Sequence, residues 1–151
     1  PLQLSGHSGI FWMAIIIVSS RVVPKPGASS LVGLTSGIMA AFLGLGDLGA
    51  LNTLLSYAMA GVGADLALVL LRDPENYFYA ALAGVIGHMA KFMVKWIFGM
   101  IAGAPAGFVA LGLAKALAGY ILFGALGGFL GALTLRALRR AGFFTYLMEK
   151  K

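Results

Sequence analysis

The sequence contains no cysteine, and it has five acidic residues and two histidines among 151 residues. Without cysteine the chain can form no disulfide, no thiolate metal site and no cysteine nucleophile. The few acids and histidines are scattered, and there is no phosphate-binding loop, no His-Glu-x-x-His zinc motif and no Ser/His/Asp arrangement. We therefore expect no catalysis, no cofactor and no bound metal.

The chain is also poor in charge. Charged residues make up 11% of it, against roughly 25% in an ordinary soluble domain, whereas 60% of the residues are hydrophobic. A soluble domain of this size cannot bury so much apolar surface. The net charge of +6 does not indicate nucleic-acid binding, because the charges lie between apolar runs and near the end of the chain. The composition predicts an all-α integral membrane protein, a single bundle of helices in the bilayer.

Turn-forming residues divide the apolar sequence into segments. A helix needs roughly 20 apolar residues to cross about 30 Å of hydrocarbon. Five segments approach this length, at about residues 9–23, 29–45, 50–71, 77–101 and 108–135, and a basic tail follows at 136–151. An odd number of spans without a signal-peptide pattern predicts one further helix upstream, and six in the full-length protein.

The basic residues fall mostly on one side of the membrane when successive loops are assigned to alternate sides. Asp47 and an uncharged link at 103–105 fall on the other side. The positive-inside tendency makes the basic side cytoplasmic, so we expect a multi-pass plasma-membrane protein with a cytoplasmic C-terminus. The basic set comprises Arg21, Lys25, Arg72, Arg136, Arg139, Arg140, Lys150 and Lys151.

Polar residues inside the apolar segments indicate a binding site. His88, Lys91 and Lys95 follow one another at spacings of three and four, so they share one helical face. Ionisable groups are costly inside a bilayer and are functional candidates by default. We expect an outward-facing pocket with an excess of positive charge, formed by Trp12, Asn52, Tyr57, His88, Lys91, Lys95 and Lys115.

Several of these residues also have a structural interpretation. Lys95 and Lys115 lie near enough to the outer interface to extend to lipid headgroups. His88 can be a packing histidine, and Trp12 can belong to an interfacial aromatic belt. Asp65, in the inner half of its segment, is expected to cap or brace a helix end rather than to relay protons.

Small residues recur every fourth position in the last two apolar segments. Gly124, Gly128 and Ala132 form one such stripe, and Ala83 and Gly87 form another. Stripes of this kind allow membrane helices to approach closely. They serve either internal packing or, where they reach the outer surface, contact with another membrane subunit, and we assign these five residues to a partner interface.

Three stretches resemble a known family: residues 21–34 (RVVPKPGASSLVGL), 60–65 (AGVGAD) and 119–128 (GYILFGALGG). They are similar to the substrate-binding S components of energy-coupling-factor vitamin transporters, most closely the type for the thiamine precursor hydroxymethylpyrimidine. The resemblance implies a six-helix bundle, an outward-open vitamin pocket, and a membrane scaffold subunit and two ATPases as partners. An acid expected shortly after the Pro-Gly-Ala turn is absent at 33–36, and the lysines suit an anionic ligand better than a neutral pyrimidine or cationic thiamine.

Two other functions compete with this interpretation. A structural membrane subunit without its own ligand would explain the small size and the stripes of small residues. An ion-coupled carrier is disfavoured, because the spans contain few acids and the sequence shows no inverted repeat.

Overall fold

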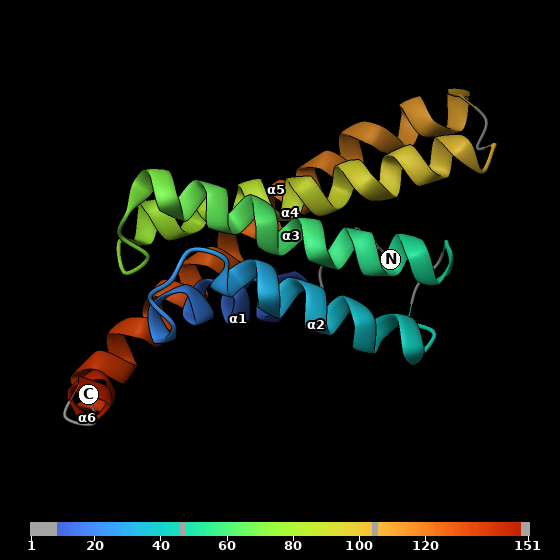
Figure 1. Ribbon diagram of the computed structural model, residues 1–151. Helices are drawn as coiled ribbons and strands as arrows, with labels where there is room; N and C mark the ends of the chain where they lie inside the picture. Colours follow the sequence, from blue (N-terminus) through green and yellow to red (C-terminus); the bar gives the residue numbers. More distant parts are fainter. Residues whose placement is uncertain (1–8, 46–47, 104–105, 149–151) are drawn as a thin grey trace.

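The computed structural model describes residues 9–45, 48–103 and 106–148, with the side chains at 106–111 and 146–148 outside that description. Most of the described residues lie in helices, and none of them lies in a strand (Figure 1). The predicted all-α membrane class is therefore confirmed. The helices are α1 (Gly9–Val22), α2 (Ala28–Phe42), α3 (Gly49–Leu71), α4 (Tyr77–Ile101), α5 (Ala106–Arg140) and α6 (Phe143–Met148).

The first five helices lie where the apolar segments predicted them, with two differences at their ends. α2 stops at Phe42, short of the predicted residue 45, because the chain turns at Gly44 with a φ of 67°. α5 continues five residues into the basic tail, since residues 136–140 are good helix formers. It ends before Gly142, whose φ of 77° suits a helix C-terminus.

Helix length distinguishes two groups. α3, α4 and residues 112–140 of α5 are long and apolar enough to cross a membrane. α1 and α2 are apolar but have 14 and 15 residues, which corresponds to about 21 and 22 Å at 1.5 Å per residue, less than the hydrocarbon thickness of about 30 Å. Three of the five predicted spans therefore meet the length requirement in the described residues, and the crossing of α1 and α2 stays a prediction.

The helices pack mainly in the order α2, α3, α4, α5 and α1. α2 and α3 form one antiparallel hairpin and α4 and α5 form another, with α3 against α4 (Figure 1). α1 lies along α5 and also touches the other three, so its buried side chains Met13, Ile16 and Ile17 reach the middle of the bundle. Around them the core consists largely of alanines, which keeps the helices close together.

Glycine brings the backbones of α4 and α5 into direct contact. A Cβ atom on Gly124 would lie 2.8 Å from the carbonyl oxygen of Gly84, and one on Gly128 would collide with the carbonyl of Ala80. α3 and α4 approach in the same way, because a Cβ on Gly87 would lie 2.6 Å from the carbonyl oxygen of Ala60. No larger residue fits at these positions.

The stripes of small residues assigned above to a partner interface are therefore used inside the chain. All five residues are buried among α3, α4 and α5, and Ala83 and Ala132 have no exposed surface. The repeat alone does not reveal which side of a helix faces a neighbour, because internal and external contacts require the same small residues. The residues in question are Ala83, Gly87, Gly124, Gly128 and Ala132.

Asp65 caps α2 from the neighbouring helix. Its carboxylate accepts hydrogen bonds from the backbone N–H of Ser29 at 3.2 Å and from the N–H and hydroxyl of Ser30 at 2.7 and 2.6 Å. These N–H groups at a helix start have no partner within the helix, and the helix dipole favours a negative charge there. The expected capping role of Asp65 is confirmed, with α2 rather than its own helix as the element capped.

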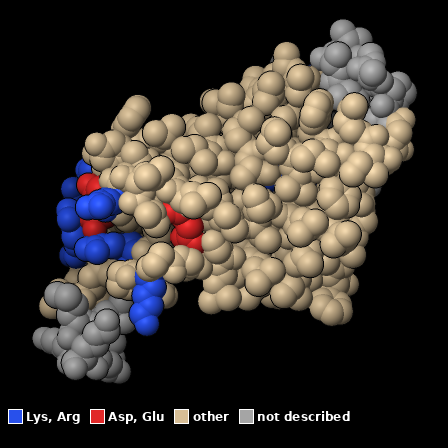
Figure 2. Space-filling model, turned by 45° about the horizontal axis from the view of Figure 1, so that its top comes forward, with Lys and Arg blue, Asp and Glu red and all other residues tan. Residues whose placement is uncertain are grey.

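Basic residues gather at one end of the bundle, where α1, α3 and α5 end and α2 and α4 begin. Figure 2 shows Lys and Arg side chains concentrated there, together with acidic ones, while most of the remaining visible surface carries neither. The helix order alone places the basic residues predicted to be cytoplasmic at this end, namely Arg21, Lys25, Arg72, Arg136, Arg139 and Arg140. Asp47, Lys150 and Lys151 lie outside the described residues, and the cytoplasmic assignment stays a prediction.

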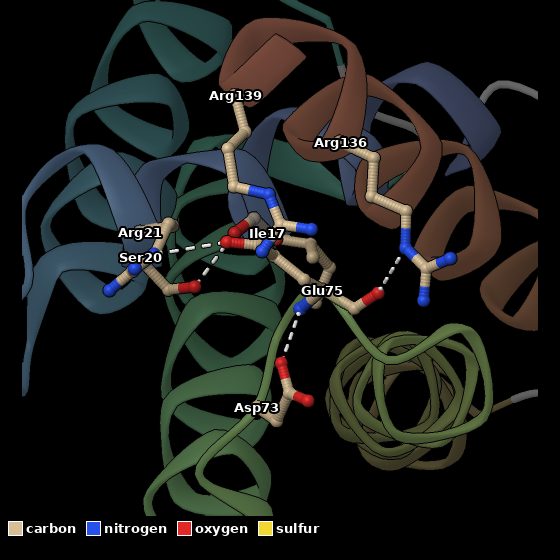
Figure 3. Close-up of polar contacts among 7 residues, drawn as sticks. All are labelled: Ile17, Ser20, Arg21, Asp73, Glu75, Arg136 and Arg139. Carbon is tan, nitrogen blue, oxygen red and sulfur yellow. Dashed lines mark hydrogen bonds and ion pairs between the residues drawn. The ribbon is translucent and has the colours of Figure 1, made fainter. Parts of the chain in front are cut away.

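Glu75 connects several arginines at this end of the bundle (Figure 3). The Glu75 side chain is 10% exposed, and its Oε1 and Oε2 lie 3.3 Å from Arg21 Nε and 2.8 Å from Arg139 Nη1. The backbone carbonyl of Glu75 accepts a hydrogen bond of 2.9 Å from Arg136 Nε, and the Arg136 guanidinium lies 3.8 Å from the centroid of the Tyr77 ring. Glu75 thus joins α1 and α5 to the loop between α3 and α4.

Gly128→Ala is expected to weaken the packing of α4 on α5, because the added methyl group would meet the backbone of Ala80. We expect a loss of about 1–3 kcal/mol, the usual range for overpacking, seen as a lower melting temperature in detergent. Gly112→Ala on α5 is the matched control, since nothing lies within 4 Å of its added atom. Equal melting temperatures for the two variants would contradict the close approach of α4 and α5.

Glu75→Gln removes the charge that holds two guanidinium groups and keeps the side-chain volume. Because the side chains of Arg21 and Arg139 are 48% and 64% exposed, we expect a loss of about 1–2 kcal/mol, less than for a fully buried pair. Arg140→Gln, at an exposed neighbouring position, is the control for a charge change at this end. A thermal melt in which Glu75→Gln is no less stable than Arg140→Gln would remove Glu75 from this role.

Candidate binding site between α1, α3 and α4

Side chains from three helices meet at Tyr57. The ammonium nitrogen of Lys91 on α4 lies 3.6 Å from the centroid of the Tyr57 ring on α3. The indole of Trp12 on α1 meets the same ring edge-on, with the centroids 4.9 Å apart. Lys91 is only 7% exposed, so its charge lies within the bundle and not on the surface. Three of the predicted pocket residues are thus brought together by the fold.

Polar side chains of α3 lie on the face of that helix that packs against α4. Gly63 faces α4, since a Cβ there would lie 3.0 Å from Gly87 Cα. Asn52 and Ser56 precede Gly63 by eleven and seven residues, close to whole numbers of helical turns, so they share its face. Both are buried, with Asn52 1% exposed. The amide nitrogen of Asn52 has no hydrogen-bond partner among the described residues, and neither does the indole nitrogen of Trp12.

His88 is held by its own contacts. Its Nδ1 lies 3.0 Å from the carbonyl oxygen of Tyr120 on α5, and its ring lies 4.5 Å from the Tyr120 ring. Because a carbonyl oxygen can only accept, Nδ1 must carry the hydrogen of this bond. Gly9 at the start of α1 packs directly on the imidazole. These contacts match the packing alternative for His88, one turn of α4 away from Lys91.

The two remaining lysines differ in their relation to this cluster. Lys95, one turn beyond Lys91 on α4, is half-buried, whereas Lys115 on α5 is exposed. The ends of α4 and α5 that are remote from the basic residues extend together away from α3 (Figure 1), so this part of α5 lies away from Tyr57. The described structure therefore does not bring Lys115 to the predicted pocket, because α5 has diverged from α3 at this position, which the sequence alone does not reveal.

Tyr120 was not among the predicted residues. It is 6% exposed and lies between His88 and Phe92, with its ring centroid 5.1 Å from that of Phe92. An aromatic residue in an apolar helix carries no special sequence signal, since packing explains most of them. In the structure Tyr120 fixes the orientation of His88 and so supports the α4 face that carries Lys91.

Residues 1–90 match the family model described as the permease component of an ABC-type cobalt transport system. The chain belongs to this permease family. No curated protein and no solved structure matches it. The matched part of the permease includes Trp12, Asn52, Tyr57 and His88 and ends immediately before Lys91.

Membership of this family makes the chain a multi-pass membrane component of an ABC-type transport system. Transporters of this class take energy from ATPase subunits, and these 151 residues contain no phosphate-binding loop. The membrane and transport predictions are therefore confirmed, and so is the general prediction of ATPase and further membrane partners.

Lys91→Met is expected to stabilise the ligand-free permease. Burial of an unpaired ammonium costs several kcal/mol, and contact with a tyrosine ring returns only about 0.5–2 kcal/mol of this. Methionine keeps the side-chain length without the charge, so the melting temperature should rise by about 2–4 °C for each kcal/mol gained. Lys25→Met, at an exposed turn, should change it little, and a lower melting temperature for Lys91→Met would show that the charge is compensated within the bundle.

Proposed function

We propose that the permease is the substrate-binding subunit of an energy-coupling-factor importer and that its cargo is a vitamin or vitamin precursor. The observation that carries the proposal is the convergence of Lys91, Tyr57 and Trp12 inside the bundle. A subunit that only filled space in a complex would have no use for a buried ammonium group and two unpartnered nitrogen donors.

The chemistry of these side chains suits an organic molecule better than a metal ion. Tyr57 and Trp12 offer ring surfaces on which a planar heterocycle can pack. Trp12 and Asn52 offer hydrogen-bond donors, and a few fixed polar groups in an apolar site are the usual basis of small-molecule orientation. A cobalt ion would need imidazole, carboxylate or thiolate ligands and would be repelled by Lys91. The described residues contain no group of three or more such ligands.

The sequence resemblance supports the finer assignment. The Pro-Gly-Ala turn at 26–28 and the last apolar helix resemble the hydroxymethylpyrimidine type of S component, which suggests a thiamine-like cargo. In such an assembly a membrane scaffold and two ATPases would be the partners, and this subunit would bind the vitamin without chemical change. The proposed role is therefore transport and not catalysis.

Native mass spectrometry of the full-length protein purified from its own host tests the proposal. A bound small molecule of vitamin mass is the expected result. If no small molecule is bound, and membrane subunits co-purify that cannot be removed without aggregation, the protein is a structural subunit and the proposal fails.

Lys91→Ala is expected to weaken binding of the captured ligand by about 10- to 100-fold, the loss typical of one hydrogen bond to a charged group. Isothermal titration with the detergent-purified protein measures this, and circular dichroism checks that the variant is folded. Lys25→Ala is the control, because Lys25 is exposed at the opposite, basic end of the bundle. Unchanged affinity in a folded Lys91→Ala protein would exclude Lys91 from the site.

A further inference from the structure

The charges around Lys91 are unbalanced. The described acids are Asp65, Asp73 and Glu75, and two of these lie in the loop that follows α3. Asp65, the nearest of the three along α3, is eight residues from Tyr57, about 12 Å along the helix, and its carboxylate is engaged with the start of α2. Among the described residues no carboxylate forms an ion pair with Lys91. The charged side chain one turn further along α4 is Lys95, which has the same sign.

The unpartnered side-chain atoms of Trp12 and Asn52 are both hydrogen-bond donors. The indole of Trp12 can only donate, and the orphaned atom of Asn52 is its amide nitrogen. The Lys91 ammonium adds three further donors and accepts nothing. Its contact in the described structure is the face of the Tyr57 ring, which neutralises no charge. A ligand that completes this site must therefore bring acceptors, and a negative charge among them.

We propose that the cargo carries an anionic group, a phosphate or a carboxylate, which binds the ammonium of Lys91. The inference rests on the proposed function and adds the chemical class of the substrate. The planar part of the cargo packs on Tyr57 and Trp12, and an acceptor of the cargo meets the free indole nitrogen of Trp12. A cationic ligand without such a group would place a second positive charge beside Lys91 in a low-dielectric interior, where repulsion is strong. This favours a phosphorylated or acidic vitamin over free thiamine or free hydroxymethylpyrimidine.

Matched probe pairs that differ only in the anionic group test this. The pairs are thiamine monophosphate with thiamine, and nicotinate with nicotinamide, titrated calorimetrically into the full-length detergent-purified protein at neutral pH. We expect the anionic member of a pair to bind at least about 10-fold more tightly, which corresponds to one charge-assisted contact. If thiamine monophosphate binds more tightly than thiamine, the site takes a phosphate. If nicotinate binds more tightly than nicotinamide, the site takes a carboxylate.

Variants of Lys91 show whether the preference arises at this residue. Lys91→Met should reduce the preference to about threefold or less, while Lys91→Arg, which keeps the charge, and Lys25→Met should retain most of it. The Lys91→Met protein should fold, because the substitution removes an unpaired buried charge. If the Lys91→Met protein does not fold, Lys91→Arg still tests whether the positive charge at this position is what the preference requires. A preference that survives in Lys91→Met, or disappears equally in Lys25→Met, overturns the assignment to Lys91.

The remaining outcomes separate this inference from the proposed function. If thiamine or nicotinamide binds as tightly as its anionic partner, the vitamin-binding role stands and the anionic class is wrong. If no probe binds, the molecule captured by native mass spectrometry shows whether the cargo is anionic. A captured vitamin with a phosphate or carboxylate supports the inference, and one without either overturns it. If nothing is captured, the proposed function fails, and the anionic cargo fails with it.

Discussion

Close contact between helix backbones is the constraint on which the rest of this structure depends. In a bilayer the lipid tails are as apolar as the side chains, so helices associate through packing and polar contacts rather than through burial from water. Gly87 on Ala60 and Gly84 and Gly128 at the α4–α5 contact let the backbones touch. The contact between α3 and α4 also sets their register. Tyr57 lies about one turn before Ala60, and Lys91 lies one turn after Gly87, so the antiparallel pair brings the ammonium onto the ring.

The same register divides the bundle into two ends with different electrostatics. At the basic end, Asp65 and Glu75 are fully used, one by the start of α2 and the other by arginines of α1 and α5. No described acid is left for the part of the bundle that holds Lys91. The acids therefore serve the folding of one end, and the unpaired charge remains at the other. Such a charge lowers stability and is typical of a site shaped for a ligand.

The structure also relates the family to the proposed cargo. The match to the cobalt permease family covers residues 1–90, so the matched region stops before Lys91, the lysine on which the site depends. The Tyr57 ring that contacts Lys91 and the indole of Trp12 beside it are not ligands that a cobalt ion prefers. Membership of the family therefore establishes membrane transport, while the side chains around Tyr57 indicate what kind of molecule such a subunit can hold.

Hydropathy and turn residues in the sequence were enough to locate the first five helices, because apolar length and helix-breaking residues act locally. The cost of an ionisable group in the bilayer likewise identified Lys91, and with it Tyr57 and Trp12, as site candidates. The sequence did not show that Ala83, Gly124 and their neighbours pack internally, that Lys115 is exposed, or that Glu75 joins α1 to α5. Those features depend on which face of each helix meets a neighbour. Contacts between residues more than fifty positions apart, such as Arg21 with Glu75, decide this, and only the tertiary structure contains them.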